Sequence, residues 1–96
     1  MTLDEFKATL TAASAPPDLA PTLRALWHDL RGDWDAAHRI AQDVVGPDGA
    51  WVHAYLHRKE GDAANAAYWY RRAGRPVASA SLDDERDAIV RALLLG

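Results

Sequence analysis

The chain has 96 residues, 49% of them apolar and 26% charged, which is typical of one ordinary folded domain and not of a multidomain enzyme. Eleven Lys and Arg residues against fourteen Asp and Glu residues give a net charge of -3, which disfavours nucleic acid and anionic membranes as partners. The absence of cysteine excludes disulfides, thiolate metal sites and cysteine nucleophiles.

The first half of the chain predicts two helices separated by a proline-containing linker. Thr2 and Glu5 form a capping-box pattern, so a first helix should begin near residue 3 and end before Pro16. A second helix should begin at Pro21, because a helix tolerates proline in its first turn, and it should end at Gly32. Its apolar stripe consists of Leu23, Leu26, Trp27 and Leu30.

The second half predicts further helices in quick succession. Asp33 is the expected N-cap of a third helix that continues until the breaker residues 46–49, and a fourth helix should cover 51–60. Asp62 and Ser81 are the expected N-caps of the last two. The apolar side of the third helix is expected to contain Trp34, Ala37, Ile40, Ala41, Val44 and Val45. No segment alternates as a half-buried strand does, so the fold should be all-α.

An internal repeat organises these helices into two hairpins. The turn Gly32-Asp33 recurs as Gly61-Asp62, and in each copy glycine ends one helix while aspartate caps the next. The segments GDWDAAHRIAQ and GDAANAAYWYRRA resemble the turn and second helix of a tetratricopeptide repeat, a likeness that covers about residues 22–76. Small residues fall where that family places them, at Ala25, Ala37, Ala54, Ala66 and Ala73.

The resulting fold prediction is a single all-α domain over residues 1–96. Five or six antiparallel helices should form a compact bundle, with tetratricopeptide-like hairpins at about 21–45 and 50–74 and flanking helices covering their open ends. The N-terminal residues lack the pattern of a secretory signal, and no stretch approaches the ~18 apolar residues of a membrane span. We therefore expect a cytoplasmic protein with no membrane or nucleic-acid partner.

Histidines provide the main candidate for chemistry. His53 and His57 are four residues apart on one helix face, and Glu60 continues that face. His28 occupies in the first hairpin the position of His57 in the second, so His28, His53 and His57 are expected to converge as ligands of zinc or another divalent metal. The alternative is that these imidazoles form hydrogen bonds between neighbouring helices, because the sequence lacks the glutamate of the HExxH metalloprotease motif.

A second candidate is an aromatic and basic cluster near the end of the fifth helix. Tyr68, Arg71 and Arg72 could hold a phosphate, a carboxylate or a nucleic-acid base. Alternatively, the arginines complement the negative end of the helix dipole. Most of the tryptophans should fill the core, and one or two should line a pocket or a subunit contact; they are Trp27, Trp34, Trp51 and Trp69.

Two functions remain open at this point. The first is a non-catalytic structural or interaction module without a cofactor, which associates with itself or with another protein through the face around His53, His57, Tyr68 and Arg72. The second is a metal- or small-ligand-binding protein, with hydrolase activity as one form of it, built on the three histidines and Glu60. The sequence favours the first function, with the second as its alternative. No catalytic residue is assigned, and a protein without enzyme activity is favoured over an enzyme.

Overall fold

The computed structural model describes all 96 residues and contains helices and no strands, which confirms the predicted all-α class. In chain order the elements are α1 (Leu3–Ala8), the short 3-10 helix η1 (Thr9–Thr11), α2 (Pro21–Leu30), α3 (Trp34–Gln42), α4 (Pro47–Glu60), α5 (Ala63–Ala73) and α6 (Leu82–Leu95). None of these helices combines the length and the apolar character that crossing a bilayer requires.

Side-chain caps begin four of the helices where the sequence predicts them. The side chains of Thr2, Asp33, Asp62 and Ser81 each accept a hydrogen bond from the backbone N–H three residues later, at 3.1, 3.1, 3.2 and 3.0 Å. Each cap satisfies one of the N–H groups that a helix start leaves unpaired. Glu5 completes the capping box of α1 by accepting from the backbone N–H of Thr2 at 2.8 Å.

The boundary between α3 and α4 differs from the expected one. Helix α3 ends at Gln42, so Val44 and Val45 lie in the connecting segment, and the Val45 side chain is 97% exposed. Helix α4 begins at Pro47, because proline is accepted at the first helical position. Gly49 lies inside this helix, against the backbone of Val44, and a Cβ there would lie 2.3 Å from the Val44 carbonyl oxygen. The four residues 46–49 are therefore a helix start and not only a helix stop.

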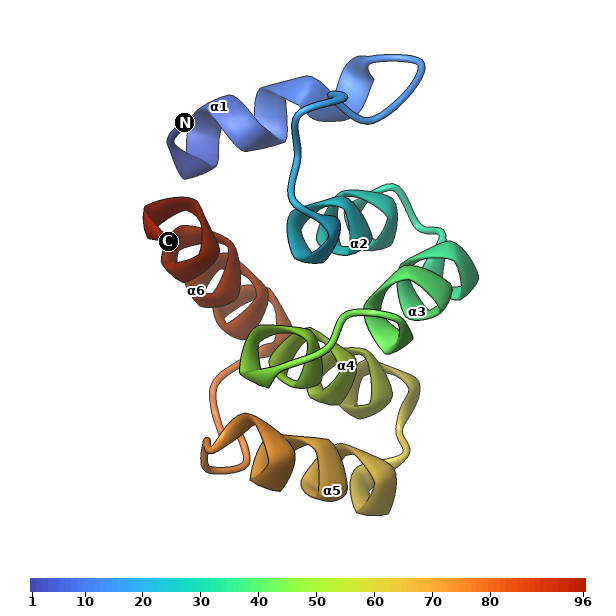
Figure 1. Ribbon diagram of the computed structural model, residues 1–96, viewed down its shortest axis with the longest axis vertical. Helices are drawn as coiled ribbons and strands as arrows, with labels where there is room; N and C mark the ends of the chain where they lie inside the picture. The colour runs from blue at the N-terminus through green and yellow to red at the C-terminus, as the bar shows by residue number, and fades with distance from the viewer.

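Helix α4 forms the centre of the fold. It packs against α5, α3, α2 and α6 (Figure 1), and every residue from Gly49 to His57 is buried. The largest fully buried side chains include Tyr55, Tyr70 and Phe6. Helices α2 and α3 form one hairpin and α4 and α5 the other, each turning at a glycine with positive φ, +82° at Gly32 and +91° at Gly61.

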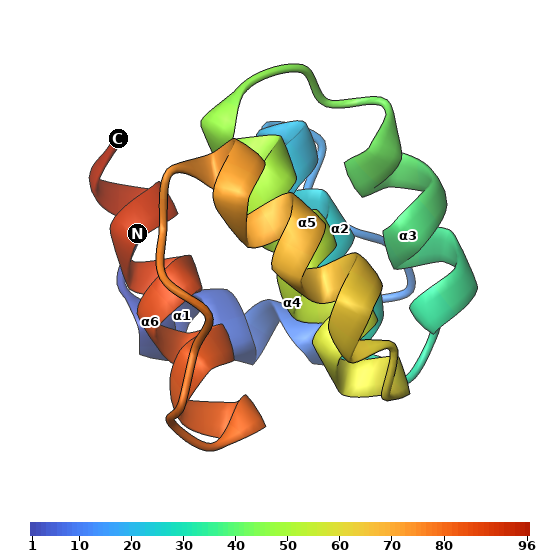
Figure 2. The ribbon, with the colours of Figure 1, turned by 90° about the horizontal axis from the view of Figure 1, so that it is seen from below.

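Helices α1 and α6 lie side by side at the edge of the two hairpins, and both chain ends lie on that side (Figure 2). Lys7 of α1 forms an ion pair with Asp87 of α6 at 3.1 Å. One carboxylate is buried between α2 and α4, where direct donors compensate its burial. Asp29 accepts from the Tyr55 hydroxyl at 2.9 Å and from Lys59 at 2.8 Å, so its buried charge has two partners.

Candidate metal site

Three imidazoles meet at the contact between α3 and α4. His38 lies on α3, and His53 and His57 lie one turn apart on α4. One nitrogen from each of the three rings lies within 4.8 Å of the others. The Nε2 atoms of His38 and His53 are 3.1 Å apart, and the rings of His53 and His57 stack at a centroid distance of 4.7 Å. We refer to these three residues as the histidine cluster.

Two tryptophans hold the rings of the histidine cluster in place. Trp34 of α3 stacks on His38 with ring centroids 4.9 Å apart, and its indole N–H donates to the Leu56 carbonyl oxygen at 2.8 Å. Trp69 of α5 stacks on His53 at 4.0 Å. Both indoles are partly buried against the core, and their stacking restricts how far the imidazoles can rotate. The cluster therefore has a preorganised arrangement.

Burial keeps two members of the cluster uncharged. The His53 side chain is 5% exposed, and this burial, with smaller contributions from nearby His57 and His38, lowers the pKa of His53 to about 4. Burial and the neighbouring His57 also lower the pKa of His38. Near neutral pH both rings are uncharged, and an uncharged imidazole is the form that donates a lone pair to a metal ion.

A carboxylate orients the third imidazole. Oε1 of Glu60 lies 2.7 Å from Nδ1 of His57, so the ring donates its Nδ1–H to the carboxylate and Nε2 is turned away from it. This is the carboxylate–histidine pairing that commonly supports metal ligands. Glu60 also belongs to a second group, with His57 and Asp62. That group is a weaker candidate for a metal site, because the Asp62 carboxylate already caps α5 and the Glu60 carboxylate already forms a hydrogen bond with Nδ1 of His57.

The expected convergence of His28 with His53 and His57 does not occur. His28 belongs to no group of ligand atoms within 4.8 Å, and its ring packs edge-on against Trp27 at 5.1 Å. It lines a separate cavity together with Arg24 and Arg31. The prediction was wrong because it assumed that α2, the first helix of its hairpin, packs beside the histidines of α4. In the structure α3 covers them.

Sequence reasoning missed His38. A weak signal was present, since His38 follows Trp34 by one turn and adjoins Ala37, on the side of α3 that was expected to be apolar. Helices that follow one another in the chain usually pack together, so the second helix of the first hairpin was as good a source of a ligand as the first.

The basic and aromatic residues of α5 divide into two groups. The guanidinium of Arg72 lies 5.5 Å from the Trp69 ring centroid and 5.7 Å from that of Tyr68, and it donates to the Tyr68 hydroxyl at 3.3 Å. Tyr68 is 43% exposed. Arg71 is exposed, and unlike Arg72 its side chain takes part in no hydrogen bond, ion pair or contact with an aromatic ring. Of the two, only Arg72 is near the histidine cluster, through Trp69.

Comparison with known proteins identifies no relative: no family model, no curated protein and no solved structure matches the chain. The resemblance to a tetratricopeptide repeat stays a prediction.

Proposed function

We propose that this protein binds a divalent metal ion, with zinc as the best fit, through His38, His53 and His57. One observation carries the proposal, the meeting of three imidazole nitrogens within 4.8 Å in a buried and largely uncharged setting. Three histidines with one open position are an established ligand set for zinc. The chain has no cysteine that would compete for such an ion.

The distance between two of the three nitrogens fits a tetrahedral ion. Two nitrogens that each bind zinc at 2.0–2.1 Å lie about 3.3 Å from one another in a tetrahedral site. The Nε2 atoms of His38 and His53 are 3.1 Å apart, so a small rotation of either ring would admit the ion. Glu60 would fix His57 with Nε2 toward the metal, and the fourth position would be left for water or a ligand.

The competing explanation uses the same atoms. At 3.1 Å the two Nε2 atoms also fit a hydrogen bond in which one imidazole donates and the other accepts. Under that explanation the cluster is structural and ties α3 to α4. The two explanations predict different affinities for zinc. A metal site binds the ion tightly, with the ion replacing the proton between the two rings, whereas a purely structural pair of imidazoles binds zinc weakly.

Zinc titration of the metal-free protein, with elemental analysis after dialysis, separates these explanations. We expect one tightly bound ion per chain in the wild type and loss of tight binding in His38→Ala, His53→Ala and His57→Ala. His28→Ala is the matched control, because His28 is the one histidine outside the cluster, and it should retain binding. Wild-type binding no tighter than that of the His38/His53/His57 triple variant would refute the proposal, and it does so even if single variants unfold.

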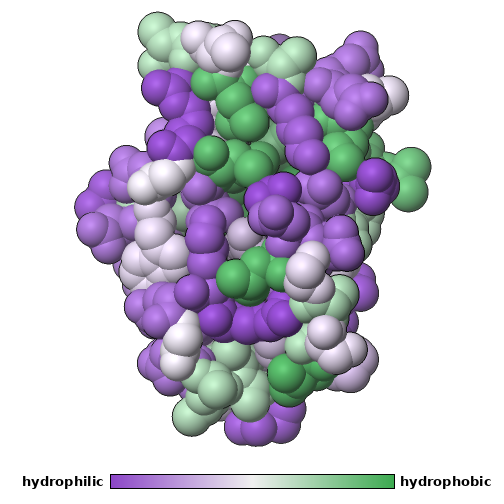
Figure 3. Space-filling model, turned by 180° about the vertical axis from the view of Figure 1, so that it is seen from behind, coloured by the Kyte–Doolittle hydropathy of each residue, from purple (hydrophilic) through white to green (hydrophobic).

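Protein association receives less support from the same geometry. The sequence suggests a face for association around two histidines, Tyr68 and Arg72. Both histidines, His53 and His57, are buried, so only Tyr68 and Arg72 of that face are exposed to a partner. On the face shown in Figure 3, hydrophilic side chains interrupt the apolar ones. Sedimentation velocity of the metal-free protein tests self-association independently of zinc, and a concentration-dependent dimer would favour the interaction function.

A further inference from the structure

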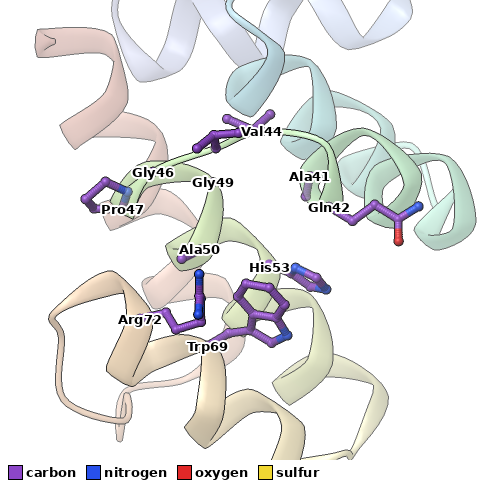
Figure 4. A pocket seen from close by; sticks show the side chains of 11 residues that line it. Ala41, Gln42, Val44, Gly46, Pro47, Gly49, Ala50, His53, Trp69 and Arg72 are labelled. Atoms are coloured by element: carbon purple, nitrogen blue, oxygen red, sulfur yellow. The ribbon is translucent and has the colours of Figure 1, made fainter.

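A cavity of about 510 Å³ adjoins the histidine cluster, between the end of α3, the start of α4 and α5 (Figure 4). His53 and Trp69 belong both to the cluster and to the cavity wall. The remaining wall is mostly small and apolar, with Ala41, Val44, Pro47 and Ala50 among its members. A volume of this order is typical of pockets for small molecules.

The cavity wall is positively charged in a protein that is negative overall. None of its residues is acidic, and Arg72 is its only permanent charge. Arg58 and Arg86 each pair with a carboxylate, whereas Arg72 has no acidic partner. Its one side-chain hydrogen bond goes to the Tyr68 hydroxyl, so most of its N–H groups remain free. A guanidinium in this state fits the two oxygens of a carboxylate.

The contacts of Arg72 place this charge against the aromatic part of the wall. Its guanidinium lies 5.5 Å from the Trp69 ring centroid, and the ring of His53 stacks on the same indole at 4.0 Å. Figure 4 shows Trp69 lying between Arg72 and His53. An anion held by Arg72 would therefore lie over an indole and beside a proposed metal ligand. Its flat or apolar body would contact the alanine, valine and proline side chains of the wall.

We infer that this cavity binds a small organic acid, with the carboxylate on Arg72 and an apolar body against Trp69. The inference deepens the proposed function, on which one part of it rests: an ion at the histidine cluster adds two positive charges to the shared wall and strengthens binding of the acid. The part that concerns Arg72 stands without the metal.

Titration with benzoate, a carboxylate with a flat apolar body, tests the inference. Binding is followed by calorimetry on metal-free and zinc-loaded protein, and benzamide serves as the uncharged counterpart. We expect benzoate to bind, benzamide to bind more weakly, and Arg72→Met to weaken benzoate by about tenfold or more, as the loss of a charge-assisted pair requires. Arg72→Lys should give an intermediate affinity, because it keeps the charge and loses the two-point geometry.

Arg71→Met is the matched control, since Arg71 is the neighbouring exposed arginine and does not line the cavity. Equal losses in Arg71→Met and Arg72→Met, equal binding of benzamide and benzoate, or no binding of benzoate would each overturn the inference. Zinc affinity is measured on the same variants and should be unchanged in Arg72→Met. If the wild type binds zinc but not benzoate, the inference about the cavity is refuted and the proposed zinc site is not. If it binds benzoate but not zinc, the proposed function and the expected enhancement by zinc are refuted.

Discussion

Acid should destabilise the metal-free protein through His53. In the folded chain its pKa is about 4, because burial and the neighbouring rings of His57 and His38 disfavour the charged form, against 6.5 for a free imidazole. Between these two values the unfolded chain binds a proton that the folded chain does not. The unfolding free energy should therefore be highest above about pH 6.5 and fall as the pH approaches 4.

The size of this effect follows from the two pKa values. Each tenfold difference in proton affinity is worth about 1.4 kcal/mol, so His53 should account for a loss of about 3 kcal/mol between about pH 7 and pH 4. A domain of this size is stable by about 5–15 kcal/mol, so the loss is a large fraction of the total. Part of His38's titration adds to it in the same direction, since its pKa is also lowered.

Urea unfolding in the presence of EDTA, followed by tryptophan fluorescence at several pH values, measures this loss. The variant His53→Gln keeps a polar side chain of similar size and removes the titrating group, so its stability should fall less steeply with acid than that of the wild type. His28→Gln, outside the cluster, should keep the wild-type slope. Equal slopes for His53→Gln and the wild type would show that the proton uptake on unfolding comes from other groups.

Two further substitutions test individual contacts. Glu60→Ala removes the carboxylate 2.7 Å from Nδ1 of His57 and should weaken zinc binding by about 10–100-fold in a competition titration, and unchanged affinity would show that Glu60 does not orient the ligand. Gly49→Ala places a Cβ 2.3 Å from the Val44 carbonyl oxygen and should lower the unfolding free energy by about 1–3 kcal/mol in urea, whereas wild-type stability would show that the segment before α4 yields easily.

Local signals were enough to locate most helix starts. Thr2, Asp33, Asp62 and Ser81 act on a backbone N–H only three residues away, so the sequence within one turn contains the whole interaction. The boundary at residues 46–49 was not predictable in this way, because proline and glycine are compatible both with a turn and with the first turn of a helix. At this boundary the close packing of Gly49 on Val44 is a contact of the helix start, and the sequence alone does not reveal it.

The candidate site divides along the same line. That His53 and His57 share a face could be read from their spacing, since the pitch of a helix alone brings such residues together. The identity of the third imidazole could not be predicted from spacing. His38 and His28 lie on different helices, and the choice between them depends on how α2 and α3 pack on α4. The stacking of Trp69 on His53 depends in the same way on how α5 packs on α4, and the pairing of Asp29 with Lys59 depends on how α2 packs on α4.

The sequence by itself therefore determined the helical class, the two glycine–aspartate hairpins and one pair of histidines on a shared face. Tertiary structure alone decided which third histidine joins them, where the cavity opens and which charges are left without a partner. The physical reason is range. Capping, turn and helix-face relations involve residues at most about four apart, whereas the docking of helices depends on whole faces of side chains drawn from distant parts of the chain.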